Sequence, residues 1–363
     1  MAGRVLWRPD STPPKRGSMK RRTGFSALFA CALAISAGAA QAQDLAQDAA
    51  EDAPPLPMDE RATWSFVWEN DYFANTDRNY TNGVRISYLS GLKQPHGVSS
   101  TLAHDILGAG PDAGIRRGFA VGHSIFTPED TLATEPLPDQ HPYAGWLYGE
   151  YSVVVEQRQR VQQITLQAGV VGPAAQGEWL QNNWHDLING DPVNGWDNQI
   201  GNEPGFVLSY DRQFRALREF GDNGFGADLT PSIGASLGNV DTRARGGLTL
   251  RIGNDLISDY GPPRVRPALA GAGFFSPVDD FSWYLFLGVN GSAVAHNIFL
   301  DGSLFRDGDP SVEKNVLVGE VQAGLALQFR RFQVAYTFVT RTKEFETQTS
   351  AQQFGAVSLS MKF

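Results

Sequence analysis

Short segments in which apolar and polar side chains alternate recur from about residue 62 to the end of the chain. At the first of them, Trp64, Phe66 and Trp68 share one face. A period of two is typical of a β-strand with one apolar face. We count about ten to thirteen such segments, among them residues 81–88, 160–171, 283–289, 317–329, 332–338 and 357–363.

The N-terminus has the three parts of an export signal. Three basic residues at 20–22 precede an apolar run over 25–37, and the small-x-small triplet Ala40-Gln41-Ala42 follows. We predict a signal peptide over 1–42, a flexible acidic and proline-rich lead-in over 43–60, and a folded domain over 61–363. The single cysteine, Cys31, leaves with the signal, so the mature chain has neither disulfides nor thiol catalysis.

An exported chain with alternating segments admits two architectures. No segment after the signal approaches the ~20 apolar residues of a membrane helix, which leaves a transmembrane antiparallel β-barrel or a secreted soluble β-sandwich. The apolar rows carry Trp, Tyr and Phe near strand ends, as interfacial girdles do. We therefore expect an all-β barrel of about 12 strands in the bacterial outer membrane, with outer-membrane lipid around it.

Two further observations bear on partners. The chain ends in an alternating segment whose last residue is Phe363, which is the form of an assembly signal read by the barrel-assembly machinery. Without residues 1–42 the chain carries 23 basic and 38 acidic residues. So acidic a chain is a poor binder of nucleic acid, and we predict no nucleic-acid partner.

One segment has a helical period instead. Over 176–188, Leu180, Trp184, Leu187 and Ile188 recur at helical spacing, which predicts a short amphipathic helix in an extracellular loop. Its apolar stripe could contact the barrel or an acyl chain. Gln181 and His185 are four residues apart and therefore lie on one face of this helix.

The densest polar cluster lies between the first two alternating segments, over 69–83. Asn70, Asp71 and Thr81 offer the amide, carboxylate and hydroxyl oxygens that calcium accepts, and the alternation points Thr81 into the lumen. We predict a calcium site at Asp71 and Asn70. The twelve-residue calcium-loop pattern is absent, and the alternative is a β-turn whose Asn and Asp side chains bond the backbone.

His185 is the best candidate base among six histidines. An imidazole can accept a proton from water near neutral pH. The alternative is a structural or helix-surface histidine. The sequence has no Gly-x-Ser-x-Gly elbow, no His-Glu-x-x-His motif and no glycine-rich phosphate loop, which disfavours serine-nucleophile and zinc-protease chemistry.

Several motifs in one order resemble the outer-membrane lipid A 3′-O-deacylase family. The resemblance covers nearly the whole mature chain. The motifs are Glu69-Asn70-Asp71, 76–83, Tyr143-Ala144-Gly145-Trp146, Val171-Gly172-Pro173, Gln181-Asn182-x-x-His185, 195–205, 261–267 and 297–302.

The resemblance implies a twelve-stranded barrel that hydrolyses the 3′ ester of lipid A with calcium as cofactor. By position, His185 would be the general base, with Asn70, Asp71, Thr81 and Gln181 around it. Two features depart from the family pattern. Gln140-His141 stands where an Asp-Arg pair is usual, and residues 127–139 contain no basic residue.

Two other functions remain open at this stage. An outer-membrane phospholipase would also be a calcium-using barrel esterase, but its His-Asp-Ser-Asn type nucleophile motif is missing. A non-catalytic barrel, acting as a pore or structural protein, needs only a polar lumen.

Overall fold

The structure, a computed structural model, describes residues 59–363 except 75, 77, 93–94, 158–159, 189–192, 220–223, 266–272 and 277–279. The predicted signal peptide and most of the predicted lead-in therefore lie outside the described residues. No helix in the described part of the chain has the length and apolar character needed to cross a bilayer.

The described strands form one antiparallel sheet that closes on itself. The first strand pairs with both the second and the last, and β6 pairs with β8 to close the far side. The strands are β1 (Thr63–Asn70), β2 (Asn79–Leu89), β3 (Gly114–Thr127), β4 (Ala144–Gln157), β5 (Arg160–Val171), β6 (Glu203–Phe214), β7 (Ala216–Glu219), β8 (Phe225–Gly238), β9 (Asp241–Asn254), β10 (Phe281–Asn297), β11 (Leu317–Phe329), β12 (Phe332–Arg341) and β13 (Gln352–Lys362).

The wall has twelve strand positions, because β6 and β7 occupy one. Both pair with β8, β6 through 207–213 and β7 through 216–219, on either side of Arg215. This confirms the predicted barrel of about 12 strands. Except β7, which pairs only with β8, every described strand pairs on both sides, and such closure is what allows a sheet to cross a bilayer.

The alternation predicted from sequence matches the two faces of the wall. On β1, Trp64 and Phe66 are 45% and 40% exposed, whereas Ser65 and Val67 are buried. The same outward apolar rows run around the barrel, where lipid would cover them. The inward row is polar and buried.

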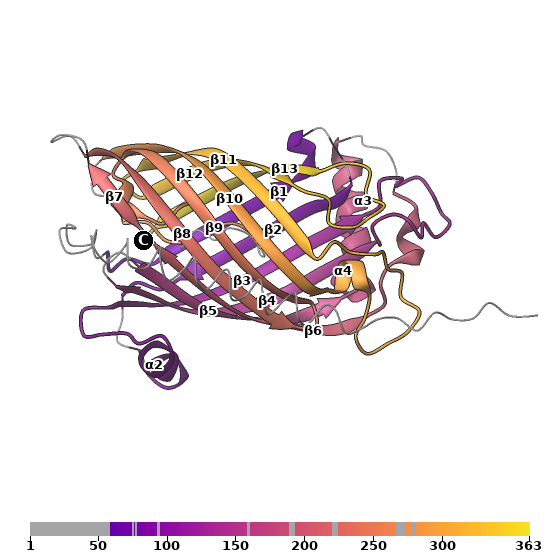
Figure 1. Cartoon of the computed structure of the whole chain (residues 1–363), viewed down its shortest axis with the longest axis horizontal. Helices are drawn as coiled ribbons and strands as arrows, with labels where there is room; N and C mark the ends of the chain where they lie inside the picture. The colour runs from indigo at the N-terminus through magenta and orange to yellow at the C-terminus, as the bar shows by residue number, and fades with distance from the viewer. Residues whose placement is uncertain are drawn as a thin grey trace, which may run out of the picture.

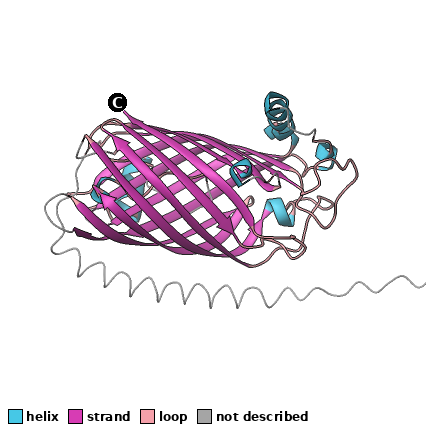
Figure 2. Ribbon diagram, turned by 90° about the horizontal axis from the view of Figure 1, so that it is seen from above, coloured by secondary structure: helices cyan, strands magenta, loops and turns pink. Residues whose placement is uncertain are grey.

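The helices lie at the two ends of the barrel (Figures 1 and 2). We call the end near Phe363 the terminal end and the other the loop end. The loop end carries η1 (Asp71–Ala74), η3 (Pro173–Ala175), α3 (Gly177–Ile188), η4 (Gly195–Asn198) and α4 (Ile298–Asp301), and the terminal end carries α2 (Val98–Thr101), η2 (Leu102–Ile106) and η5 (Leu256–Ser258). The helix predicted over 176–188 is confirmed as α3.

Oppositely charged side chains pair across the inside of the barrel. Arg85 contacts Glu150 at 2.6 Å, and Arg245 contacts Asp211 at 2.5 Å, all four being buried. A buried charge without a partner would be strongly destabilising. The pairs therefore neutralise the lumen rather than lining an open channel.

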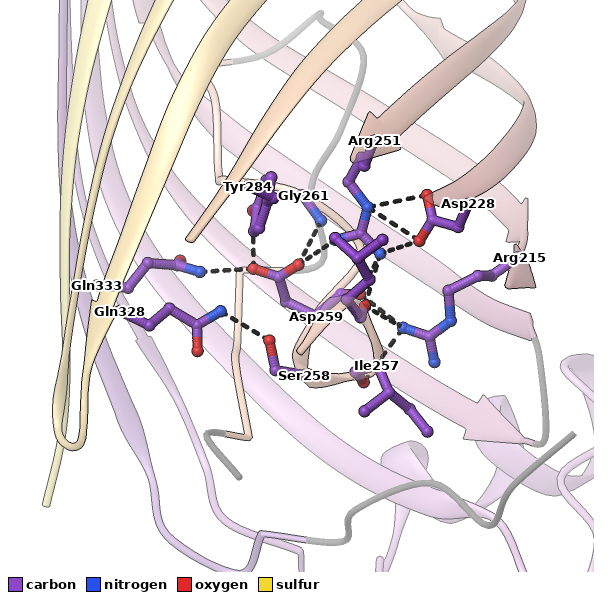
Figure 3. Close-up of polar contacts among 11 residues, drawn as sticks. Arg215, Asp228, Arg251, Ile257, Ser258, Asp259, Gly261, Tyr284, Gln328 and Gln333 are labelled. Carbon is purple, nitrogen blue, oxygen red and sulfur yellow. Dashed lines mark hydrogen bonds and ion pairs between the residues drawn. The ribbon is translucent and has the colours of Figure 1, made fainter. Parts of the chain in front are cut away.

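Between β9 and β10, the described residues 255–265 and 273–276 fold into the lumen from the terminal end, and we call them the luminal loop. Its Asp259 bonds Arg251, the hydroxyl of Tyr284 (2.9 Å) and the amide of Gln333 (2.5 Å) (Figure 3). Arg251 also bonds Asp228 on β8. The start of the loop is thus tied to four strands.

Removing Arg251 should destabilise the barrel. Arg251→Met leaves Asp228 and Asp259 buried without their cation, at a cost of about 3–5 kcal/mol. The transition temperature should fall, measured as the temperature at which the folded, fast-migrating form is lost on electrophoresis. Arg330→Met is the control, because Arg330 and Asp280 pair at the surface, 73% and 80% exposed. Equal transition temperatures for the two variants would contradict the role given to this network.

Candidate functional site on the outer wall

Helix α3 begins in close contact with β4. The turn before it passes through Gly172, whose φ of +99° favours glycine and whose amide donates to the Gly145 carbonyl at 3.0 Å. A Cβ added at Gly145 would lie 3.3 Å from the Cα of Gly177. These glycines let the helix start directly against the barrel wall.

The other end of α3 reaches β1. The rings of Trp184 and Trp68 pack edge-to-face with centroids 5.5 Å apart, and Phe73 packs on the other side of Trp68. Strands β4, β3, β2 and β1 are consecutive, so this distance is three interstrand spacings, roughly 14 Å. Trp68 is on the lipid-facing row of β1. Helix α3 therefore crosses the outer face of β3 and β2.

The wall-facing side of α3 includes buried polar side chains beside its apolar ones. Gln181 is 3% exposed and His185 is 9% exposed, whereas Trp179 and Leu187 are 62% and 74% exposed. The predicted apolar stripe is therefore only partly correct: Trp184 packs on the wall, but Leu187 points away from it. Neither Nε2 nor Oε1 of the Gln181 side chain makes a hydrogen bond in the described part of the chain. This buried amide is therefore available to a ligand.

Thr81 lies on the same outer side, and the prediction that it points into the lumen is wrong. A β-bulge between Tyr80 and Asn82 interrupts the alternation. Tyr80 faces the lumen, and the Thr81 hydroxyl instead bonds that of Thr127 at 2.8 Å. Thr127 follows lumen-facing Phe126 and so belongs to the outer row of β3.

Asn70 and Asp71 form the end of β1 and the start of η1. Asn70 continues the outer row of Trp68, and its side-chain oxygen accepts from the Tyr72 amide at 2.7 Å. Asp71 is 1% exposed and accepts from the Arg78 amide at 2.6 Å. These bonds hold the backbone of Tyr72 and of Arg78 against the end of β1, as the alternative of a β-turn with Asn and Asp side chains bonded to the backbone anticipated.

Contacts made by neighbouring residues bring the five predicted residues into one region. Trp184 touches Trp68, which is two residues before Asn70. One helical turn earlier, Leu180 packs against the cluster containing Ile125, which is two residues before Thr127, the partner of Thr81. Gln181 and His185 therefore face the part of the wall that carries the other three residues.

The donor types suit calcium better than a softer metal. In the described part of the chain, no three His, Cys, Asp or Glu side chains come together as a metal site. Asp71 supplies a buried carboxylate, and Asn70 and Gln181 supply amide oxygens. Calcium accepts such oxygens together with backbone carbonyls and water. The residues present therefore fit calcium in kind.

Sequence reasoning missed several residues of this region. Thr127 ends an alternating strand, and only its pairing with the bulge reveals its contact with Thr81. The side chain of Arg78 bonds Glu129 and the hydroxyl of Ser350. It thereby joins three external loops beside Asp71. Thr127 stands in no pattern that would have singled it out, and Arg78 lies within the 76–83 motif but had no role assigned to it.

His141, which departs from the family pattern, is a packing residue. Its ring stacks on Phe126 with centroids 5.4 Å apart, and its Nδ1 lies 2.8 Å from the Pro142 carbonyl. Burial lowers the pKa of His141, and the bond to Pro142 opposes this only in part. The ring is thus neutral near pH 7 and does not replace a fixed positive charge.

A cavity of about 50 Å³ lies elsewhere, in the lumen between the wall and α4. Glu69, Tyr80, Arg243 and Arg341 are among its lining residues. The site described above is on the outer face of the same strands, so the cavity is separate from it.

A closed twelve-stranded antiparallel barrel with lipid-facing apolar rows defines an outer-membrane β-barrel protein. The chain belongs to the LpxR family, because the family model described as outer membrane protein LpxR matches residues 27–363. In outer-membrane barrels the longer loops are extracellular and the short turns are periplasmic, from which we infer that the end that carries α3 is extracellular.

One solved structure supports the fold, and a second is only distantly similar. LpxR from Salmonella typhimurium is 19% identical, with a TM-score of 0.68 over 83% of this chain and 100% of that chain. The β domain of the Bordetella autotransporter BrkA is 10% identical, with a TM-score of 0.41 over 84% of this chain and 98% of that one. No curated protein sequence matches the chain.

The Trp68–Trp184 contact should hold α3 on the wall. Trp184→Ala removes the ring that packs on β1, so amide hydrogen exchange in α3 should rise by about tenfold or more. Trp179→Ala is the matched control, because Trp179 lies on the same helix and is largely exposed. If both variants exchange like the wild type, α3 does not depend on this contact.

Proposed function

We propose that this protein is a calcium-dependent esterase that hydrolyses the 3′-acyloxyacyl ester of lipid A in the outer membrane. The observation that carries the proposal is the buried polar side of α3. Gln181 and His185 face the outer wall where Asn70, Asp71 and Thr81 lie. The family assignment and the resemblance of the motifs support the same activity.

The position of the site suits a lipid substrate. It is on the outside of the barrel near the extracellular end, where the outer-leaflet lipid meets the wall. Trp179, Leu187 and Tyr72 are exposed apolar side chains on α3 and η1, each more than 60% exposed. We infer that they contact acyl chains, and that the buried polar side receives the ester and its sugar.

His185 would act as the general base. Its imidazole takes a proton from a water molecule, whose oxygen attacks the ester carbonyl carbon. When the tetrahedral intermediate collapses, the bond from the carbonyl carbon to the sugar 3′ oxygen breaks. The imidazolium then returns its proton to that oxygen. The products are a free acyloxyacyl carboxylic acid and a 3′ hydroxyl.

Asp71 and Asn70 would hold the calcium ion, with Gln181 and Thr81 orienting water and substrate. When bound, calcium would supply positive charge that stabilises the developing oxyanion as a Lewis acid. Asp71 already has one oxygen fixed by the Arg78 amide. That bond orients the carboxylate before any ligand arrives.

The lumen argues against the alternative of a pore. The luminal loop and the ion pairs of the wall occupy the interior, including buried Asp259, Tyr260 and Arg264. A phospholipase-type esterase remains the nearer alternative, and it predicts a different product. Mass spectrometry of lipid A and of phospholipid from cells that express the chain separates the two.

Replacing His185 should abolish activity without preventing folding. His185→Ala should reduce release of 3′-linked acyl chains by about 10² to 10⁴, measured by mass spectrometry of lipid A. Gln181→Ala should be impaired in the same direction. His96→Ala is the control, because His96 is exposed at the terminal end. Each variant must keep the fast electrophoretic mobility of the folded barrel; wild-type rates for His185→Ala would show that the base is misassigned.

Activity should require calcium. Excess chelator should abolish acyl release, and calcium should restore it better than magnesium, because an adaptable set of oxygen ligands favours the larger ion. Asp71→Asn should raise the calcium concentration needed for half-maximal rate. Unchanged hydrolysis in excess chelator would remove the metal from the mechanism.

A further inference from the structure

The luminal loop spans much of the barrel's length from inside. At its base, the Ser276 amide donates to the Ser258 carbonyl at 2.7 Å. The Ser258 hydroxyl accepts from Gln328 on β11, and Arg264 donates to Gln322 on the same strand at 2.7 Å. Six residues of β11 separate these contacts, so the loop rises roughly 20 Å between them.

The top of the loop binds the residue just before the site. Arg264 donates through Nε to Glu69 at 2.5 Å, and the Val265 amide donates to the same carboxylate oxygen at 3.1 Å. The Tyr80 hydroxyl bonds the other oxygen at 2.9 Å. The Arg264 and Glu69 side chains are both 2% exposed. Burial of this pair means that either charge alone would be costly.

Glu69 is the last lumen-facing residue of β1. Asn70 ends the paired part of the strand, and Asp71 begins η1. The positions of the two predicted calcium ligands are therefore fixed from the lumen side by the anchor at Glu69. The Val265 side chain also lies close to Gly83, which is directly opposite Glu69 on β2. A Cβ added at Gly83 would lie 3.4 Å from Cγ1 of Val265.

We propose that Arg264 is a positioning residue that acts through Glu69 to hold Asn70 and Asp71 in place for calcium. The luminal loop, which starts at the periplasmic end, thereby supports a site on the extracellular outer wall. This inference rests on the proposed function for its catalytic consequence. Its structural consequence, the stability of the hydrogen bonds made by Asn70 and Asp71, does not depend on that function.

Two measurements on purified, folded barrel in detergent test the proposal. In Arg264→Gln, amide hydrogen exchange over 70–81 should rise by about tenfold or more. The calcium dissociation constant, measured by titration calorimetry, should rise by roughly 10- to 100-fold, because the loss of a residue that holds a metal ligand in place weakens metal binding by about this factor. The double variant Glu69→Gln with Arg264→Gln should have an exchange rate and a calcium dissociation constant closer to those of the wild type, because it leaves no unpaired buried charge.

Arg245→Gln is the matched control. Arg245 is a buried luminal arginine on β9 whose partner is Asp211 on β6, so this ion pair does not include a residue of β1. The Arg245→Gln variant should leave amide exchange over 70–81 and the calcium affinity unchanged. If Arg264→Gln does not fold, Glu69→Gln, which preserves the shape of the side chain, takes its place in both measurements.

The outcomes separate the two claims. Wild-type exchange over 70–81 in the folded variant, or an equal rise in Arg245→Gln, would overturn the positioning role. If exchange rises only in Arg264→Gln while the wild type neither binds calcium nor releases acyl chains, the positioning role stands and the proposed function fails.

Discussion

The hydrogen-bonded seam between the first and last strands is the constraint on which the other features depend. Pairing of Thr63–Asn70 with 355–362 closes the sheet, so every described strand except the short β7 is paired on both sides. Closure creates an inside that must neutralise its charges and an outside that lipid can cover. It also fixes where β1 ends, and hence where Glu69 faces inward while Asn70 faces the outer wall.

Much of this architecture could be predicted from the sequence, because the wall is governed by a local rule. The rows that contain Trp64 and Phe66 follow strict alternation, and α3 follows helical spacing. The alternation failed at Thr81, where one extra residue in a bulge moved the side chain to the outer face. A bulge leaves no mark in a pattern of apolar and polar residues, so only the pairing partner of the strand reveals it.

The site and the luminal loop were predictable to different degrees. The motif resemblance brought Gln181 and His185 together with Asn70 and Asp71, and the contacts of α3 place them in one region. The pairing of Arg264 with Glu69 joins residues 195 positions apart. Arg264 lies outside any helix or strand, so neither periodicity nor local spacing could predict this pairing. Long-range pairing of buried charges is a property of the closed fold.

The exposure of Trp179 and Leu187 on α3 has a consequence for how any ligand arrives. A site on the flank of a barrel is entered sideways, within the plane of the leaflet, rather than from the water above. Encounter then depends on how many target molecules share the leaflet and on how fast they diffuse in two dimensions. The rate of encounter would therefore depend on the mole fraction of the target lipid in the leaflet. Neighbouring lipids or proteins that crowd or stiffen the leaflet would lower this rate without contacting the site.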